Sequence, residues 1–193
     1  MKHEVTTLNT KKAFAASLKK AMEKKPFTKI TVSEIINDCN VNRKTFYYHF
    51  EDIYALLKWM FEQEAIEVVK SFDLLVNYEE AIIFVMDYVD KNKHILNCAY
   101  DSIGRDEMKR FFVADFIGVM RTVIDGAQQK LEITVDENFK SFLTGFITEA
   151  LAGTLVDWFR DKNVRNREDT LGYISLIFKE SLPNILMAKA IKM

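Results

Sequence analysis

Glycine and proline are scarce in this chain, and their placement constrains the fold more than any other feature. The only prolines among 193 residues are Pro26 and Pro183, and the first glycine is Gly104. Strands joined by hairpins need such turn residues at regular intervals. Apolar residues instead recur at spacings of three and four, the period of an α-helix. We therefore predict an all-α fold.

The apolar spacing divides the chain into a series of expected helices. We expect a small N-terminal domain over 1–52, with a first helix at 9–24 and two short helices within 31–50, and a larger helical domain over 53–193. A long helix over 52–71 should link the two. The expected remainder is a helix at 77–92, a break near Lys91–Lys93, a short piece through Tyr100, a helix at 104–130 interrupted near Gly118, and two long helices at 134–160 and 167–190.

The stretch from Thr31 to Phe50 is the candidate functional centre. It divides into two short helical pieces around Asn40-Val41-Asn42, and Asn42 can cap the second piece. Phe46 and Phe50 lie four apart and share one face, which leaves cationic and aromatic side chains on the other. Two helices joined by a tight turn in this way are typical of a DNA-reading helix-turn-helix. A pair of amphipathic helices with a merely solvated polar face would give the same pattern.

Charge is distributed unevenly along the chain. Residues 1–50 carry ten Lys and Arg against four Asp and Glu, whereas residues 51–193 carry seventeen against twenty-four, so the net charges are +6 and −7. Positive charge gathered around the candidate reader is what contact with DNA phosphates requires.

Residues 11–57 resemble the N-terminal domain of TetR-type transcriptional regulators. The resemblance rests on an amphipathic segment from Phe14 to Met22, Phe27 ahead of Thr31-Val32, the run Thr45-Phe46-Tyr47-Tyr48-His49-Phe50, and a further helix beginning near Asp52. The segments KKPFTKITVSEI and CNVNRKTFYYHF are similar in particular to the branch that includes regulators of dihydroxyacetone kinase operons.

The resemblance implies binding to palindromic double-stranded DNA by a homodimer. It implies base-edge contacts from the first turn of the second helix, phosphate or sugar contacts from its aromatic side, and backbone contacts at the start of the first helix. The candidate DNA-binding residues are Thr31, Ser33, Asn42, Arg43, Lys44, Thr45, Tyr47, Tyr48 and His49.

Three positions depart from the family pattern. Pro26 stands where many members have glycine, and Asn40 stands at the usual turn glycine, where asparagine is tolerated because it enters the left-handed region readily. Ile53 occupies a position where the family usually has a lysine that binds phosphate, so we expect one fewer backbone anchor.

The last two helices are the candidates for dimerisation. Large apolar residues alternate with small ones between Phe139 and Phe159, and Gly145 and Gly153 suggest a close approach of backbones. Packing against a symmetry mate would form a four-helix interface, although the same residues could pack only inside one subunit. The candidate interface residues are Leu143, Ile147, Leu151, Leu155, Trp158, Ile174 and Phe178.

The segment 77–138 is rich in Phe, Tyr and Met. Such residues usually form core, yet an apolar cavity with a few polar groups is also the usual character of a small-molecule site. The family resemblance implies a small-molecule or protein effector here. The candidate pocket residues are Phe84, Tyr88, His94, Cys98, Phe112, Phe116 and Met120.

Signals for catalysis, metal binding and membrane insertion are weak. His94 and Cys98 lie four apart without a third ligand at a suitable spacing, so we expect neither a metal site nor a cofactor. No apolar run approaches the ~18 residues of a membrane span. With two cysteines and no signal peptide at the N-terminus, we expect a reducing, cytoplasmic setting.

We therefore interpret the chain as a dimeric TetR-type regulator whose affinity for DNA is modulated through its C-terminal domain. Two alternatives remain. One is an interaction protein of the same shape that does not bind DNA, and the other is a small all-α enzyme that uses the central cavity.

Overall fold

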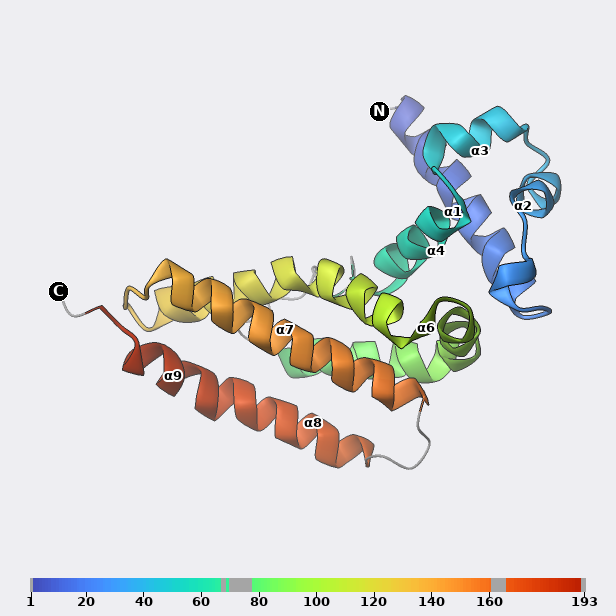
Figure 1. Ribbon diagram of the computed structural model, residues 1–193. Coiled ribbons are helices and arrows are strands. Elements are labelled where there is room, and N and C mark those ends of the chain that lie inside the picture. Colours follow the sequence, from blue (N-terminus) through green and yellow to red (C-terminus); the bar gives the residue numbers. More distant parts are fainter. Residues whose placement is uncertain (1, 67–68, 70–77, 161–165, 192–193) are drawn as a thin grey trace.

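The computed structural model describes residues 2–66, 69, 78–160 and 166–191, and within them the chain is a series of helices joined by turns (Figure 1). The predicted all-α class is confirmed, since the described residues contain no strand beyond an isolated bridge between Val135 and Ala190. The elements are α1 (Lys2–Met22), η1 (Phe27–Lys29), α2 (Val32–Asp38), α3 (Arg43–His49), α4 (Ile53–Phe61), η2 (Glu62–Ile66), α6 (Tyr78–Lys130), α7 (Glu137–Arg160), α8 (Arg167–Leu176), η3 (Ile177–Ser181) and α9 (Leu182–Ala188).

The first three helices fold around aromatic side chains that the sequence places four residues apart. Phe46 of α3 is fully buried and lies 5.3 Å from Phe14 of α1, measured between ring centroids. Phe50 closes the same cluster at 6.4 Å from Phe14. Burying a side chain of this size contributes about 1.5–3 kcal/mol. This apolar contact fixes the angle between α1 and α3, and so fixes which face of α3 is exposed.

Helix α4 joins this small lobe, which contains α1, α2 and α3, to a larger lobe that contains α6, α7, α8 and α9. Its buried side chains, Leu56, Leu57 and Met60, belong to the same apolar cluster as Phe14 and Leu96 of α6. The helix begins at Ile53, one residue after the expected start, because Asp52 is its N-cap, and it continues into the π-helical turn η2. The predicted end of this helix, at residue 71, lies outside the described residues.

A carboxylate of η2 connects the two lobes. Glu64 Oε2 accepts hydrogen bonds from Lys19 Nζ of α1, at 2.7 Å, and from the Tyr88 hydroxyl of α6, at 3.0 Å. Burial, together with the neighbouring carboxylate, raises the pKa of Tyr88, so the phenol remains a proton donor across the physiological range. We call Lys19, Glu64 and Tyr88 the junction triad.

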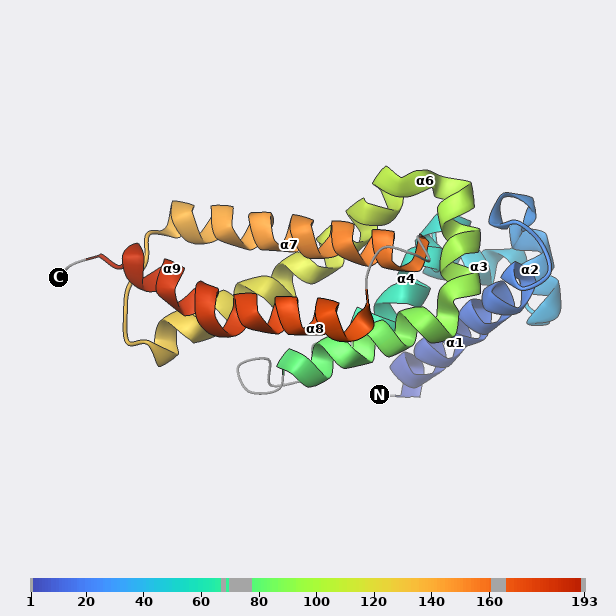
Figure 2. The same cartoon turned by 90° about the horizontal axis from the view of Figure 1, so that it is seen from below.

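Helix α6 is kinked at Gly104, which has φ 82° and ψ 169°, and its last part runs back roughly opposite to its first part (Figure 2). The breaks predicted near Lys91–Lys93 and Gly118 are wrong, because both stretches are helical. The amide of Asn92 donates to the Tyr88 carbonyl one turn earlier, so this polar residue is satisfied without ending the helix. The predicted helix start at residue 104 instead coincides with the kink.

Replacing Gly104 with Ala is expected to destabilise the protein by about 1–3 kcal/mol, because this region of φ/ψ space is open almost only to glycine. The matched control is Gly118→Ala in the same helix, which should be neutral or stabilising by up to about 1 kcal/mol. An added Cβ would meet nothing within 4 Å at either position, so a steric clash contributes to neither. Urea unfolding measures both values, and equal stabilities would contradict a strained backbone at Gly104.

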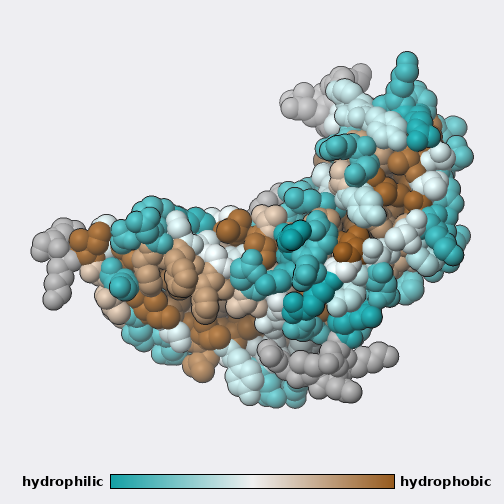
Figure 3. Space-filling view, viewed as in Figure 1, coloured by the Kyte–Doolittle hydropathy of each residue, from teal (hydrophilic) through white to brown (hydrophobic). Residues whose placement is uncertain are grey.

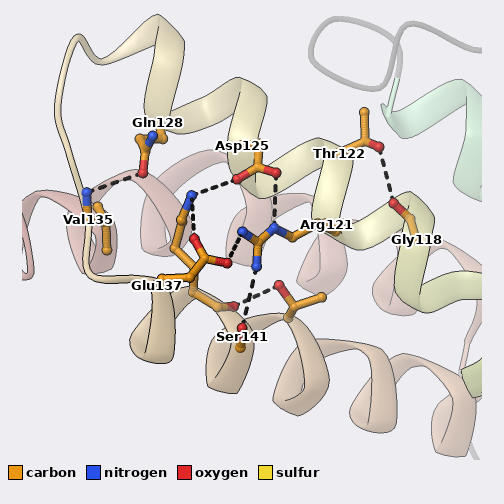
Figure 4. A network of polar contacts seen from close by, with 10 residues as sticks. Gly118, Arg121, Thr122, Asp125, Gln128, Val135, Glu137 and Ser141 are labelled. Atoms are coloured by element: carbon orange, nitrogen blue, oxygen red, sulfur yellow. Dashed lines mark hydrogen bonds and ion pairs between the residues drawn. The ribbon is translucent and has the colours of Figure 1, made fainter.

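The last part of α6 and helix α7 form an antiparallel hairpin, and an ionic network links the two helices (Figure 4). Asp125 accepts from Arg121 Nε at 3.0 Å and from Lys140 Nζ at 2.9 Å, and Glu137 pairs with both cations. The hydrogen bond from Lys140 is the main cause that holds the pKa of Asp125 below its usual range, and the hydrogen bond from Arg121 lowers it further. Helix α7 begins at Glu137 rather than at the expected residue 134, and the expected helix over 167–190 consists of α8, η3 and α9.

Candidate nucleic-acid interface

Side-chain caps define both helices of the candidate reader. Thr31 caps α2 by accepting from the Glu34 amide at 3.3 Å, while the Glu34 carboxylate accepts from the Thr31 amide at 2.8 Å. Asn42 caps α3 by accepting from the Thr45 amide at 2.9 Å, as predicted. Between them Asn40 has φ 53°, the left-handed conformation expected of it. Thr31 and Asn42 thus set where each helix begins.

Arg43 stands at the first position of α3 and is held from two directions. Its Nη2 donates to the Tyr47 hydroxyl at 3.1 Å, and the guanidinium carbon lies 5.5 Å from the centroid of the Tyr47 ring. Its Nη1 donates to Ser33 Oγ of α2 at 3.4 Å. These contacts orient a planar, five-donor group that can pair with a guanine edge in a bidentate manner.

The nine candidate DNA-binding residues all reach the surface of α2, the turn and α3. Thr45 and His49 are half-buried, and the His49 ring packs 6.3 Å from that of Phe14. Tyr48 is the most open of the aromatic residues, with 71% of its surface exposed. The other six, also exposed, are Thr31, Ser33, Asn42, Arg43, Lys44 and Tyr47. Their contact with DNA stays a prediction.

The two acidic residues of α2 are paired with cations from the end of α1 and from the turn that follows it. Lys25 pairs with Glu34 and lowers the pKa of that carboxyl, and the Thr31 amide lowers it further. Lys20 Nζ lies 2.8 Å from Asp38 Oδ1 and likewise lowers the pKa of Asp38. Among the side chains that the structure describes, Arg43 and Lys44 form no ion pair, so α3 keeps its positive charge.

Sequence reasoning missed three features of this surface. The capping box has a readable signal, Thr31 followed three residues later by Glu34. The Arg43–Tyr47 contact follows from the spacing of four on a helix. The bond to Ser33 has no sequence signal, because it depends on the angle between α2 and α3. Ile53, at the departure from the family pattern, packs half-buried against the apolar core.

The candidate effector residues do not share one cavity. A cavity of about 130 Å³ lies among α6, α7, α8 and η3, and Phe116 and Met120 line it. Phe84, Tyr88, His94, Cys98 and Phe112 are not part of its lining. Tyr88 belongs to the junction triad, His94 is exposed, and Cys98 Sγ donates to the Lys25 carbonyl at 3.6 Å. Four of these five residues precede the kink at Gly104, and Phe112 follows it.

Of the candidate dimer residues, Leu143 is buried and the other six are half-buried, and their place in an interface stays a prediction. Leu143 is 5% exposed, Ile147 packs beside it, and the other five, Leu151, Leu155, Trp158, Ile174 and Phe178, line the same cavity. An added Cβ at Gly145 would meet nothing within 4 Å, so the close backbone approach expected there does not occur within the subunit. The exposed large apolar residues of α7, α8 and η3 are Phe142, Phe146, Tyr173, Leu176 and Ile177. We call these five the exposed apolar face.

The described residues contain no cluster of three or more His, Cys, Asp or Glu that could hold a metal ion. None of the described helices combines the length and apolar character that a membrane crossing requires.

Comparison with known proteins finds similarity to transcriptional regulators. The family described as "Bacterial regulatory proteins, tetR family" matches residues 17–60, and "Transcriptional regulator C-terminal region" matches residues 76–179, more than half of the chain. The chain is 22% identical over 142 residues to the "HTH-type dhaKLM operon transcriptional activator DhaS" of Lactococcus lactis subsp. lactis (strain IL1403), covering 74% of this chain and 75% of the relative. A solved structure, "Dihydroxyacetone kinase operon activator DhaS", has the same fold, with a TM-score of 0.65 and 19% identity over 94% of this chain and 98% of that one.

Proposed function

Since this chain belongs to the TetR family of bacterial transcriptional regulators, we propose that it binds a palindromic operator as a homodimer, with one α3 in each of two successive major grooves. The single observation that carries the proposal is the Arg43 guanidinium, which is exposed at the start of α3 and oriented by Tyr47 and Ser33. Orientation before binding reduces the entropy lost when the side chain meets a base. The protein acts as a regulator and not as an enzyme, as its family does.

The exposed apolar face supports dimerisation. Phe142 and Phe146 of α7 stack with their ring centroids 6.0 Å apart and keep 65% and 63% of their surface exposed. Figure 3 displays hydrophobic side chains gathered over α7 and the neighbouring last helices. A contiguous apolar surface of this kind marks an interaction site. A second copy would cover it symmetrically, with the open side of Gly145 admitting a partner side chain.

We further infer that the larger lobe controls the spacing of the two readers. A ligand or protein partner can act only through its different affinity for the arrangements that fit and do not fit consecutive grooves. Helix α4 would transmit the change because its buried side chains pack in both lobes. This proposal includes a domain boundary after residue 52, a cytoplasmic location of the protein, and control of its DNA affinity by the larger lobe.

Selection of bound fragments from host genomic DNA tests the function. We expect recovery of a palindrome whose half-site centres lie about one helical turn apart. The curated relative is named as an activator of a dhaKLM operon, so promoters of dihydroxyacetone kinase genes are the first candidates to examine. Recovery of random fragments only would contradict sequence-specific binding.

Salt dependence distinguishes a DNA-binding regulator from an interaction protein of the same fold, the alternative that Ile53 makes worth testing. Affinity for the recovered fragment should fall about 10³- to 10⁵-fold between 50 and 200 mM salt if six to ten phosphates are contacted. Fluorescence anisotropy over this range gives the slope. A flat response would favour the interaction protein.

A further inference from the structure

The cavity in the larger lobe is lined almost wholly by hydrocarbon. Of its sixteen lining residues, thirteen are aliphatic, phenylalanine or methionine. They come from both halves of α6, from α7, α8 and η3, and from Val69 beyond η2. No charged side chain is among them. A cavity of such composition favours a ligand that needs no hydrogen bonds.

The three remaining lining residues have polar atoms that are already engaged. Thr154 Oγ1 donates to the Ala150 carbonyl at 2.8 Å, and Thr170 Oγ1 donates to the Asn166 carbonyl at 3.0 Å. Trp158 Nε1 donates to Asp90 Oδ1 at 3.3 Å. Each of these protons is therefore directed to a protein oxygen. A polyol or an ion brought into the cavity would lose its water and find no free donor in return, with only the two threonine oxygens as acceptors.

The volume indicates the size of the apolar group that can be buried here. The cavity measures about 130 Å³, close to the roughly 150 Å³ of an engineered apolar cavity in another protein that takes benzene or xenon. We propose that this cavity binds a small, uncharged, apolar molecule about the size of benzene, and that it excludes dihydroxyacetone and other polyols. This deepens the proposed function, on which the regulatory role of the ligand rests, although binding itself can be measured without DNA.

Calorimetry and thermal unfolding of the full-length protein with benzene test the proposal, with dihydroxyacetone and glycerol as polar probes. At a benzene concentration tenfold above Kd, Tm should rise by about 3–6 °C. The two polar probes should give neither heat of binding nor a shift in Tm. Absence of benzene binding, or binding of dihydroxyacetone in competition with benzene, would overturn the proposal.

Variants locate the binding in this cavity. Ala81→Leu adds bulk to the lining from α6 and should weaken benzene binding at least tenfold, whereas Ala114→Leu, the same change at an exposed position of α6, should leave it unchanged. Thr154→Val, which removes a lining hydroxyl, should bind benzene at least as well as the parent. Equal benzene affinity in Ala81→Leu and the parent would overturn the proposal.

A second substitution covers the case in which Ala81→Leu fails to fold. Met120→Ala enlarges the cavity and should increase the affinity for naphthalene at least tenfold over the parent. No gain for the larger ring would count against the assignment. Operator titrations with and without benzene are read separately. An unchanged DNA affinity beside intact benzene binding would contradict modulation by the ligand, and not the choice of ligand class.

Discussion

Replacing Phe146 with Glu is expected to separate the proposed dimer into monomers and to lower operator affinity by at least a hundredfold. The side chain is 63% exposed within one subunit and stacks on Phe142, so its apolar area is available to a second copy. Loss of one buried phenylalanine from each side removes about 3–6 kcal/mol. Each introduced carboxylate would also lose water without gaining a partner. A monomer holds only one half-site, which accounts for the expected loss of DNA binding.

Analytical ultracentrifugation at micromolar concentration measures the assembly, and anisotropy with a labelled operator measures binding. Ile117→Glu is the matched control, because it places the same charge at another exposed apolar residue, on α6 and outside the exposed apolar face. The control should remain dimeric. A Phe146→Glu protein that sediments like the parent would remove α7 from the interface.

Replacing Arg43 with Ala should abolish the preference for one base pair in each half-site and reduce operator affinity by about a hundredfold or more. A bidentate arginine–guanine pair is worth about 1–3 kcal/mol, and a dimer would lose two of them. Affinity for unrelated DNA should change much less, because phosphate contacts dominate there. Competition with a set of single-base operator variants identifies the position at which discrimination is lost.

Tyr47→Phe provides the sharper companion to Arg43→Ala. It keeps the ring beneath the guanidinium but removes the hydroxyl that accepts from Arg43 Nη2. A smaller loss of discrimination, about tenfold or less, is expected at the same base pair. If Tyr47 contacts only the DNA backbone, the phenylalanine variant will weaken binding to every sequence equally, and the orienting role will be refuted.

The small lobe was predictable because its determinants are local. The cap at Asn42, the left-handed Asn40 and the pairing of Phe46 with Phe50 depend on residues within a few positions of one another. The orientation of Arg43 toward Ser33 was not predictable, since ten residues and an interhelical angle separate them.

The larger lobe was predictable in composition but not in arrangement. Apolar spacing identified the last two helices, yet it cannot tell which apolar stripe faces the subunit and which remains exposed. Leu143 and Phe142 are adjacent large hydrophobic residues, and only packing assigns one to the interior and the other to the surface. Residues on both sides of the kink at Gly104 line the cavity, whereas His94 and Cys98, which lie between them, do not.

The junction triad has a mechanical consequence. Lys19, Glu64 and Tyr88 meet where the small lobe joins the large one, whereas α3 lies at the far end of the small lobe (Figure 1). A rotation about this seam barely stretches the bonds at the pivot, but it sweeps the reading helix through a long arc. A small rotation of the small lobe about Glu64 would therefore move Arg43 a much larger distance relative to the groove it is proposed to read.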